Sequence, residues 1–424
     1  MTVTPNEGDD MNSLTPPSSA ARSDLLEEAR RVFSGSYVDL LREKGHDFLE
    51  EEGAGSGLSD SDGAHYLDCY TSAGTYNLGR RNETIAASFK QAIDETDQGN
   101  FVMLSDYKAL LARRLAEFVP GNLDCVFFGV TRGDSMEAAC KLARGFTTRP
   151  EFVTVDGGLY GEDGFALALS ERPGKEQFGA LIPGVKTVPF GDVDAARTAI
   201  TSQTAAVVLE PIQAENHCRR AAPEYYRQLR ALCDAAGAKL IFDETQSGFG
   251  RTGTKFLFEQ LGVWPDILVI GEAMTGGMFP MTAMVFTPEL KQFFDAHPLI
   301  HLCTFGGHDL GCVVAMAALD EYERRTPWDN AATLGGRLLQ DLTALAAKHP
   351  GKIASVAGIG LLVSIKLASA ELAKQFCAAT RRNGMLVNTG RVAPTTVLVR
   401  PALLIGPEDV ARIVGVTAQT AESL

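Results

Sequence analysis

Three acidic residues each stand directly after a predicted strand, and this placement indicates one shared site. Glu210, Asp243 and Glu272 each follow a short apolar run within two residues. The runs are residues 205–209, 240–242 and 267–270. In open α/β sheets, ligands bind beyond the carboxyl ends of the strands. Burial raises the pKa of a carboxyl group toward neutrality, where it can move protons. The sequence therefore predicts a crevice in which Glu272 and Glu210 are the candidate catalytic residues, although a helix-capping role for Glu210 fits its position equally well.

The segments around these acids closely resemble the core of a known enzyme family. Asp243 opens the run Asp-Glu-Thr-Gln-Ser-Gly-Phe-Gly-Arg-Thr-Gly, Glu210 opens Glu-Pro-Ile-Gln-Ala-Glu, and His301 opens His-Leu-Cys-Thr-Phe-Gly-Gly-His. Over roughly residues 25 to 410, the chain resembles the class III (ornithine/acetylornithine-type) pyridoxal-phosphate aminotransferases. The resemblance implies a fold-type I architecture and pyridoxal phosphate (PLP) or pyridoxamine phosphate (PMP) as cofactor.

The resemblance also assigns cofactor contacts to residues that match the family's motifs. Asp243 corresponds to the aspartate that pairs with the pyridinium nitrogen, and Gln246 to the residue that contacts the phenolic oxygen. Thr304 corresponds to the threonine that reaches the cofactor phosphate of the other subunit, which implies a homodimer with shared sites. Arg132, Gly133 and Asp134 lie at the mouth of the helix predicted at residues 136–144, where the family's backbone N–H groups hold the phosphate.

Several residues in these motifs depart from the family's pattern. Glu272 stands where the family has the lysine that holds the cofactor as a Schiff base, and a carboxylate cannot form that bond. Arg132 replaces a glycine and Gly133 a threonine or serine, so Arg132 either strengthens phosphate binding or fills the space instead. Leu159 replaces an aromatic residue that stacks on the cofactor ring, and Tyr160 beside it offers a ring in exchange.

Three hypotheses on function follow from the altered motifs. The first is an enzyme that binds PLP or PMP non-covalently and uses Glu272 as general acid/base on a small amine or carbonyl compound, in an elimination, cyclisation or dehydratase-like step. The second is a cofactor-independent enzyme that uses Glu272 and Arg132 on the same scaffold. The third is a non-catalytic partner of an active homologue. The simultaneous changes at Arg132 and Leu159 argue against a lysine variant made on purpose. Arg400 is offset by about two positions from the family's substrate-carboxylate arginine, so the substrate stays unidentified.

Short apolar runs alternate with helical stretches along the chain. Further strands are predicted at residues 125–128, 152–155 and 282–286, and helices at 109–118, 136–144 and 224–236. This alternation is typical of an α/β fold with a mostly parallel, doubly wound sheet. Beyond Gly311, helices at 328–347 and 370–383 and a strand at 396–400 predict a smaller α+β domain.

The predicted organisation has four parts. They are a disordered leader at 1–22, an N-terminal segment at 23–80 that packs with the small domain, a large cofactor-type α/β domain at 81–310, and a C-terminal small α+β domain at 311–424. A helix is expected from Ser23 to Phe33, and a hairpin is expected around Asp62-Gly63.

Composition narrows the class of protein. With 424 residues, 45% hydrophobic and 22% charged, the chain is ordinary for a soluble globular enzyme. A net charge of −14 disfavours nucleic acid or an anionic membrane as partner. Eight cysteines and seven histidines lack metal-binding spacings, which predicts reduced thiols and no metal site. No signal peptide is evident, and no apolar run reaches the ~18 residues of a membrane span, so we expect a cytoplasmic protein.

Overall fold

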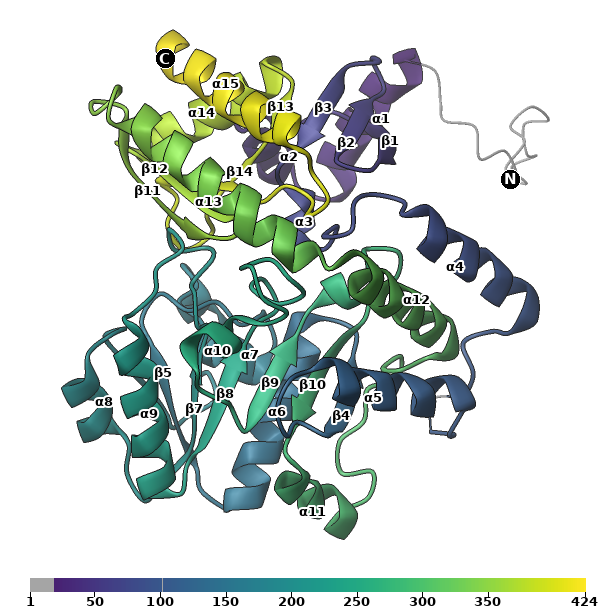
Figure 1. Cartoon of the computed structure of the whole chain (residues 1–424), viewed down its shortest axis with the longest axis vertical. Coiled ribbons are helices and arrows are strands. Elements are labelled where there is room, and N and C mark those ends of the chain that lie inside the picture. The colour runs from purple at the N-terminus through teal and green to yellow at the C-terminus, as the bar shows by residue number, and fades with distance from the viewer. Residues whose placement is uncertain (1–18, 101) are drawn as a thin grey trace, which may run out of the picture.

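A large α/β domain lies below a smaller α+β domain in the computed structural model (Figure 1). The structure describes residues 19–100 and 102–424, except for the side chains of residues 19–24 and of Glu272. Most of the predicted leader, residues 1–18, lies outside the described residues. Within the described part, no helix is both long and apolar enough to cross a membrane.

The large domain is built on a seven-stranded sheet with the order β4-β10-β9-β8-β7-β5-β6. Its strands are β4 (Cys125–Gly129), β5 (Glu151–Val155), β6 (Val185–Val188), β7 (Thr204–Leu209), β8 (Lys239–Asp243), β9 (Ile267–Ile270) and β10 (Thr282–Phe286). Only β10 runs antiparallel to its neighbours β4 and β9, and the other pairs are parallel. The predicted mostly parallel, doubly wound sheet is therefore confirmed.

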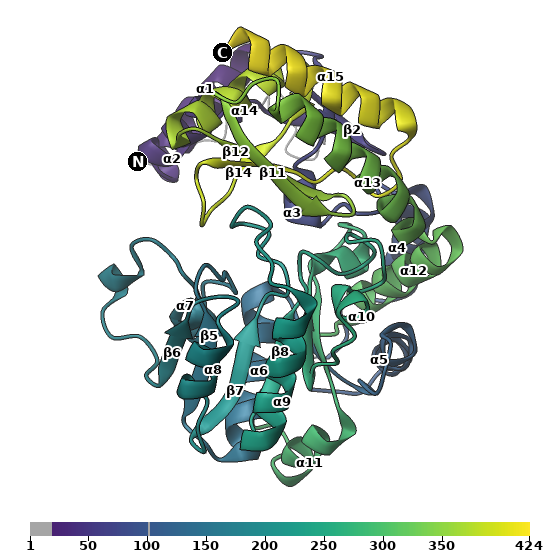
Figure 2. The ribbon, with the colours of Figure 1, turned by 60° about the vertical axis from the view of Figure 1, so that its left-hand side comes forward.

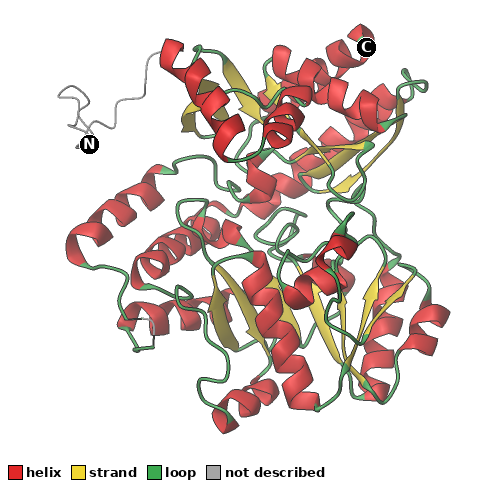
Figure 3. Cartoon of the chain, turned by 180° about the vertical axis from the view of Figure 1, so that it is seen from behind, coloured by secondary structure: helices red, strands yellow, loops and turns green. Residues whose placement is uncertain are grey.

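Helices cover both faces of this sheet, which explains why every residue of β7 is buried. Helix α6 (Arg132–Thr147) crosses one face, while α8 (Val193–Ala199) and α9 (Pro223–Ala236) cover the other (Figures 2 and 3). Ile241 of β8 packs in one core with Met136 of α6, whereas Phe242 packs in another with Leu229 of α9. The remaining helical elements of the domain are α4 (Glu83–Glu95), α5 (Asp106–Phe118), α7 (Gly164–Leu169), η1 (Lys175–Phe178), α10 (Leu257–Leu261), η2 (Glu272–Thr275), α11 (Pro288–Ala296) and α12 (Asp309–Arg325).

The smaller domain combines an antiparallel sheet with three helices around its own core. The strands are β11 (Ile353–Ile359), β12 (Leu362–Leu367), β15 (Thr396–Val399) and β14 (Asn388–Thr389), in that spatial order. The helices are α13 (Pro327–Ala346), α14 (Ala370–Arg382) and α15 (Pro407–Ser423).

The N-terminal segment shares a second small sheet with the C-terminal region. Its elements are α1 (Ser19–Val32), α2 (Gly35–Glu43), β1 (Glu50–Ala54), β2 (Gly57–Asp60), β3 (His65–Asp68) and α3 (Thr71–Gly74). Strand β13 (Met385–Leu386) pairs in parallel with β3, so residues more than 300 positions apart are hydrogen-bonded. This pairing fixes the start of α3 beside the small domain.

The turn at α3 has a left-handed backbone. Thr71, Ser72 and Ala73 have φ values of 46°, 48° and 62°, and Gly74 has a φ of 98°. Each non-glycine residue in this region costs about 1–2 kcal/mol. Surrounding contacts hold the turn, because the Thr71 amide donates to Asp68 Oδ1 (2.7 Å) and the Thr71 hydroxyl to the Arg400 carbonyl (2.6 Å).

Candidate active site

A cavity of about 580 Å³ opens at the carboxyl ends of the strands, between the two domains. The large domain contributes Arg132, Gly133, Leu159, Asp163, Glu215, Thr245, Gln246 and Ala273 to its wall, among others. The left-handed turn contributes Ser72 and Ala73, and the C-terminal region contributes Arg391 and Arg400. All three parts of the chain therefore build one site.

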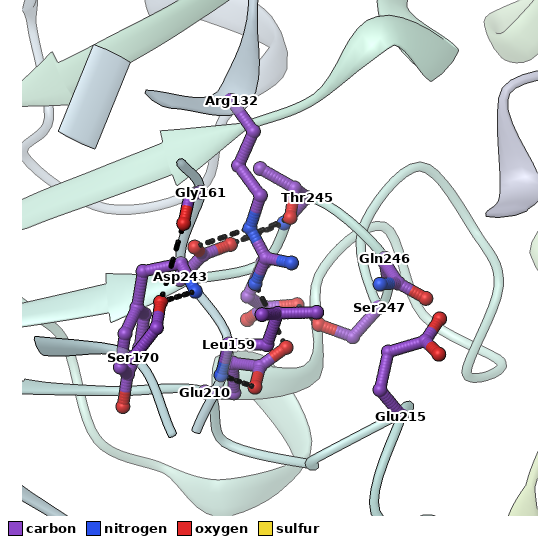
Figure 4. A network of polar contacts seen from close by, with 12 residues as sticks. Arg132, Leu159, Gly161, Ser170, Glu210, Glu215, Asp243, Thr245, Gln246 and Ser247 are labelled. Carbon is purple, nitrogen blue, oxygen red and sulfur yellow. Dashed lines mark hydrogen bonds and ion pairs between the residues drawn. The ribbon is translucent and has the colours of Figure 1, made fainter. Parts of the chain in front are cut away.

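The guanidinium of Arg132 sits between two of the predicted acids. Its Nε donates to Asp243 Oδ2 and its Nη2 to Glu210 Oε1, both at 2.8 Å (Figure 4). Arg132 is the first residue of α6, while the acids follow β7 and end β8, so the sheet edge brings all three together. The side chains of Asp243 and Glu210 are 0% and 2% exposed, against 14% for Arg132.

Every carboxylate oxygen of this triad has a donor. Asp243 Oδ1 accepts from the amide and the hydroxyl of Thr245, at 3.0 and 2.7 Å. Glu210 Oε2 accepts from the amide of Leu159 at 3.0 Å. Buried charges persist only when they are paired and hydrogen-bonded in this way. Arg132, Glu210 and Asp243 thus form an ion network within the protein, in which every carboxylate oxygen already has a hydrogen-bond donor.

The two acids share a single cation, and the pKa of Glu210 reflects it. Burial raises the pKa of Glu210 to about 7, Arg132 opposes this rise, and the charge of Asp243 adds to it. Burial alone would lower the pKa of Arg132, but Asp243 and Glu210 outweigh burial and raise it. Arg132 therefore carries its charge at neutral pH, whereas Glu210 gains or loses its proton close to neutral pH.

Glu210→Gln tests this assignment through the pH dependence of stability. The folded protein holds a proton on Glu210 up to about pH 7, whereas the ordinary pKa is 4.5, so the native state binds more protons between these values. The contribution of Glu210 to the free energy of unfolding is therefore largest below pH 4.5 and is lost as pH rises to about 7. Denaturant unfolding measured between pH 4.5 and about pH 7 should show that the free energy of unfolding falls with rising pH in the wild type. It should fall less steeply in the Glu210→Gln variant. Equal slopes would contradict the assignment. Glu244, whose pKa burial also raises to about 7, contributes to both proteins alike.

Carboxylates also occupy the start of α6, where the resemblance places a phosphate. Asp134 caps the helix, because its Oδ2 accepts from the amides of Val130 and Thr131 at 3.1 and 3.2 Å. A Cβ atom on Gly133 would overlap the carboxylate of Asp163. Burial raises the pKa of Asp163, with Asp134 and Glu162 adding to the effect. The glycine at 133 is thus explained by an acid that packs against it.

The other predicted site residues are spread over different surroundings. Gln246 lines the cavity. Tyr160 lies in the core instead, since its hydroxyl is bonded to Thr154 (3.0 Å) and the Val208 carbonyl (3.3 Å), and its ring is not on the cavity wall. Thr304 is exposed in the loop before α12. Glu272 begins η2 directly after Gly271, and its side chain lies outside the described part of the chain.

A second buried ion pair crosses the cavity between the domains. Arg400 Nη1 donates to Glu215 Oε1 at 2.9 Å and to Gln246 Oε1, and Glu215 Oε2 accepts from the Arg391 amide at 2.9 Å. Burial alone would raise the pKa of Glu215, but Arg400 and the Arg391 amide outweigh it and keep the pKa below its usual value. The Glu-Pro-Ile-Gln-Ala-Glu motif contains Glu215, but nothing in it indicates Arg400 as the partner.

Known proteins agree with this architecture. Residues 42–420 match the profile of the family described as aminotransferase class-III. The chain belongs to the class III aminotransferase family. An uncharacterized aminotransferase of Archaeoglobus fulgidus is 34% identical over 389 residues, 92% of each chain. A putrescine aminotransferase of Pectobacterium atrosepticum is 33% identical over 418 residues, 95% of this chain and 89% of the relative.

Solved structures of aminotransferases share the fold. The ornithine aminotransferase of Toxoplasma gondii superposes with a TM-score of 0.88 at 23% identity, over 95% of both chains. An (S)-enantioselective omega-transaminase of Thermomicrobium roseum gives a TM-score of 0.88 at 25% identity, over 96% of this chain and 99% of the other. The predicted fold-type I architecture is thereby confirmed.

Class III aminotransferases use PLP or PMP, and the residues here do not fit that cofactor in the family's arrangement. The motif match assigns Asp243 to the ring nitrogen, yet Arg132 already occupies the Asp243 oxygen that Thr245 leaves free. At the start of α6, the carboxylate of Asp163 packs against Gly133 and would repel a phosphate there. Among the described residues, no group of three or more His, Cys, Asp or Glu side chains could hold a metal ion instead.

Proposed function

We propose that this member of the class III aminotransferase family is an enzyme for a small amine or carbonyl compound that works without PLP or PMP. The observation that carries the proposal is the 2.8 Å contact between Arg132 Nε and Asp243 Oδ2. It gives Asp243 a resident cation in the place of a cofactor ring. This is the cofactor-independent hypothesis, in which Arg132 supplies positive charge to the crevice.

Glu272 is the proposed general acid/base. Its backbone follows Gly271, where a Cβ would lie 2.8 Å from the Thr245 carbonyl oxygen, and it precedes Ala273. Thr245 and Ala273 both line the cavity, which puts the backbone of Glu272 at the cavity's edge. A carboxylate there would take or give a proton on a bound compound. Glu210 would then stabilise the charged form of Arg132 rather than contact the substrate, because both carboxylate oxygens of Glu210 already accept hydrogen bonds.

Non-covalent binding of PLP or PMP is the second candidate. The retained Gln246 on the cavity wall and Asp243 beneath it favour this function. It requires Arg132 to leave Asp243, so that the pyridinium N–H becomes the cationic partner of Asp243 and the buried Glu210 loses its guanidinium. The homodimer stays a prediction as well, supported by the exposed apolar residues Leu302 and Phe305 (45% and 57%) on either side of Thr304.

Titration with PLP and PMP separates the two candidates. Ligand binding to the native state raises its stability, so a cofactor-binding site would give a saturable rise in the melting temperature. We expect no such rise for the wild type, and no pyridoxyl-lysine adduct in the cavity after borohydride reduction and mass spectrometry. A saturable rise with either cofactor would overturn the cofactor-independent proposal.

Two matched variants test whether Arg132 keeps the cofactor ring away from Asp243. With Glu272→Lys alone, Arg132 still occupies Asp243, so borohydride should trap little pyridoxyl adduct at position 272. With Arg132→Gly added, the ring site is open and the trapped adduct should increase. Equal trapping in the single and the double variant would show that Arg132 does not exclude the cofactor.

A further inference from the structure

A second cavity, of about 550 Å³, lies between a loop of the large domain and the sheet of the small domain. The loop is formed by residues 216–220, directly after Glu215. The opposite side belongs to α13, β11 and β12 and consists of Leu339, Thr343, Val356, Ala357, Gly358 and Lys366. Among the described residues, this cavity and the candidate active site have no lining residue in common, so the two are separate.

The charged side chains on the wall of this second cavity are all positive. They are Arg219, Arg220 and Lys366, and no Asp or Glu of the described chain lines it. Arg219 is paired with Asp156 at 3.0 Å. Arg220 and Lys366 are exposed, and within residues 19–100 and 102–424 neither side chain has a hydrogen-bond or ion-pair partner. Because the whole chain has a net charge of −14, this wall is a local concentration of positive charge.

His217 attaches the loop to the small-domain sheet through two serines. Its Nε2 lies 2.8 Å from the Ser355 hydroxyl, and its Nδ1 lies 3.0 Å from the Ser364 hydroxyl. Lys366 stands opposite Ser355 in the register of β11 and β12, so its side chain leaves the sheet on the face that His217 contacts. Burial and the charge of Lys366 lower the pKa of His217, so the imidazole positions the loop without adding a charge at neutral pH.

The loop has a strained backbone at this contact. His217 and Cys218 have φ values of 56° and 48°, and a non-glycine residue in this region costs about 1–2 kcal/mol. Such strain persists only where the surrounding structure holds it, and it is concentrated at binding sites and switch regions. The hydrogen bonds from His217 to the two serines hold it here, and they keep Arg219 and Arg220 beside Lys366 on the cavity wall.

We infer that this second cavity binds a small molecule that carries phosphate groups, with Arg220 and Lys366 as the residues that pair with them. A guanidinium binds phosphate oxygens through two parallel hydrogen bonds, and an ammonium adds a compact charge. A phosphate group brings up to about two negative charges and three acceptor oxygens, which suits two cations that no carboxylate neutralises. The inference is independent of the proposed function, because it uses no residue of the candidate active site.

Calorimetric titration of the full-length protein with inorganic pyrophosphate at low salt tests the inference. We expect saturable binding to the wild type. Arg220→Gln and Lys366→Gln should each raise the Kd about 10-fold, and the double variant about 100-fold, which is the range for hydrogen bonds to charged groups. Malonate, which carries two carboxylates in place of the phosphates, should bind about 10-fold more weakly than pyrophosphate, because each carboxylate has one charge and two oxygens.

Lys348→Gln is the matched control for the two substitutions. Lys348 is an exposed cation of the same domain that does not line the second cavity, so its removal should leave the Kd for pyrophosphate unchanged. Arg220 and Lys366 are exposed as well, and the melting temperature of each variant without ligand verifies that it is folded. Absence of saturable binding to the wild type, malonate binding as tight as pyrophosphate, or the same Kd in the control and the double variant would overturn the inference.

Discussion

Arg132→Met is expected to lower the free energy of unfolding by about 3–5 kcal/mol, the cost of removing one partner from a buried ion network. The substitution leaves Asp243 and Glu210 buried without their shared cation. Because burial raises the pKa of Glu210 to about 7, this acid is neutral more often at mildly acidic pH, and the loss should be smaller there than at neutral pH. Denaturant unfolding at both pH values measures the loss and its direction.

Neutralising the two acids provides the matched control. In the Arg132→Met protein, adding Glu210→Gln and Asp243→Asn removes the uncompensated charges while the Thr245 and Leu159 donors keep an acceptor. Most of the stability should return, since replacing a whole buried ion network is often close to neutral. If the single variant were as stable as the wild type, the guanidinium would not be the cation that these acids require.

Glu215→Leu is the second substitution with a large expected effect. It leaves Arg400 buried with Gln246 as its remaining side-chain acceptor and frees the Arg391 amide. Because the pair joins the large domain to the C-terminal region, we expect a loss of about 3–5 kcal/mol in the free energy of unfolding. Chemical denaturation of the two proteins at neutral pH gives the difference.

An exposed ion pair shows what an ordinary charge removal costs. Arg227 and Glu224 are paired at 2.9 Å with side chains 54% and 59% exposed, so Glu224→Leu should cost less than about 1 kcal/mol. The double variant Glu215→Leu/Arg400→Leu should be less destabilised than Glu215→Leu, because no buried cation is then left alone. Additive losses would show that the two residues are not coupled.

The pattern of apolar runs was sufficient to predict the large sheet. Strands such as β7 and β8 are buried on both faces, and so they appear in the sequence as short continuous apolar segments. The strands of the C-terminal region were harder to predict from the sequence, because β13 is only two residues long and is stabilised by pairing with β3 of the N-terminal segment. The left-handed turn at Thr71–Gly74 had no signal either, since three of its four residues are not glycine.

The site was only partly predictable for a similar reason. Strand ends placed Glu210 and Asp243 at one edge, but two functions of Arg132 remained open in the sequence. The choice depends on side-chain direction: the guanidinium turns toward the two acids rather than toward the helix start, where Asp134 and Asp163 stand. The pairing of Glu215 with Arg400 joins residues 185 positions apart, and no local pattern encodes such a contact.

A crystal structure of the wild-type protein grown with excess PMP tests the central claim most directly. We predict that Arg132 Nε remains within hydrogen-bond distance of Asp243 Oδ2, near the 2.8 Å seen here, and that no pyridine ring lies against Asp243. A ring nitrogen bonded to Asp243, with Arg132 turned away, would contradict the account.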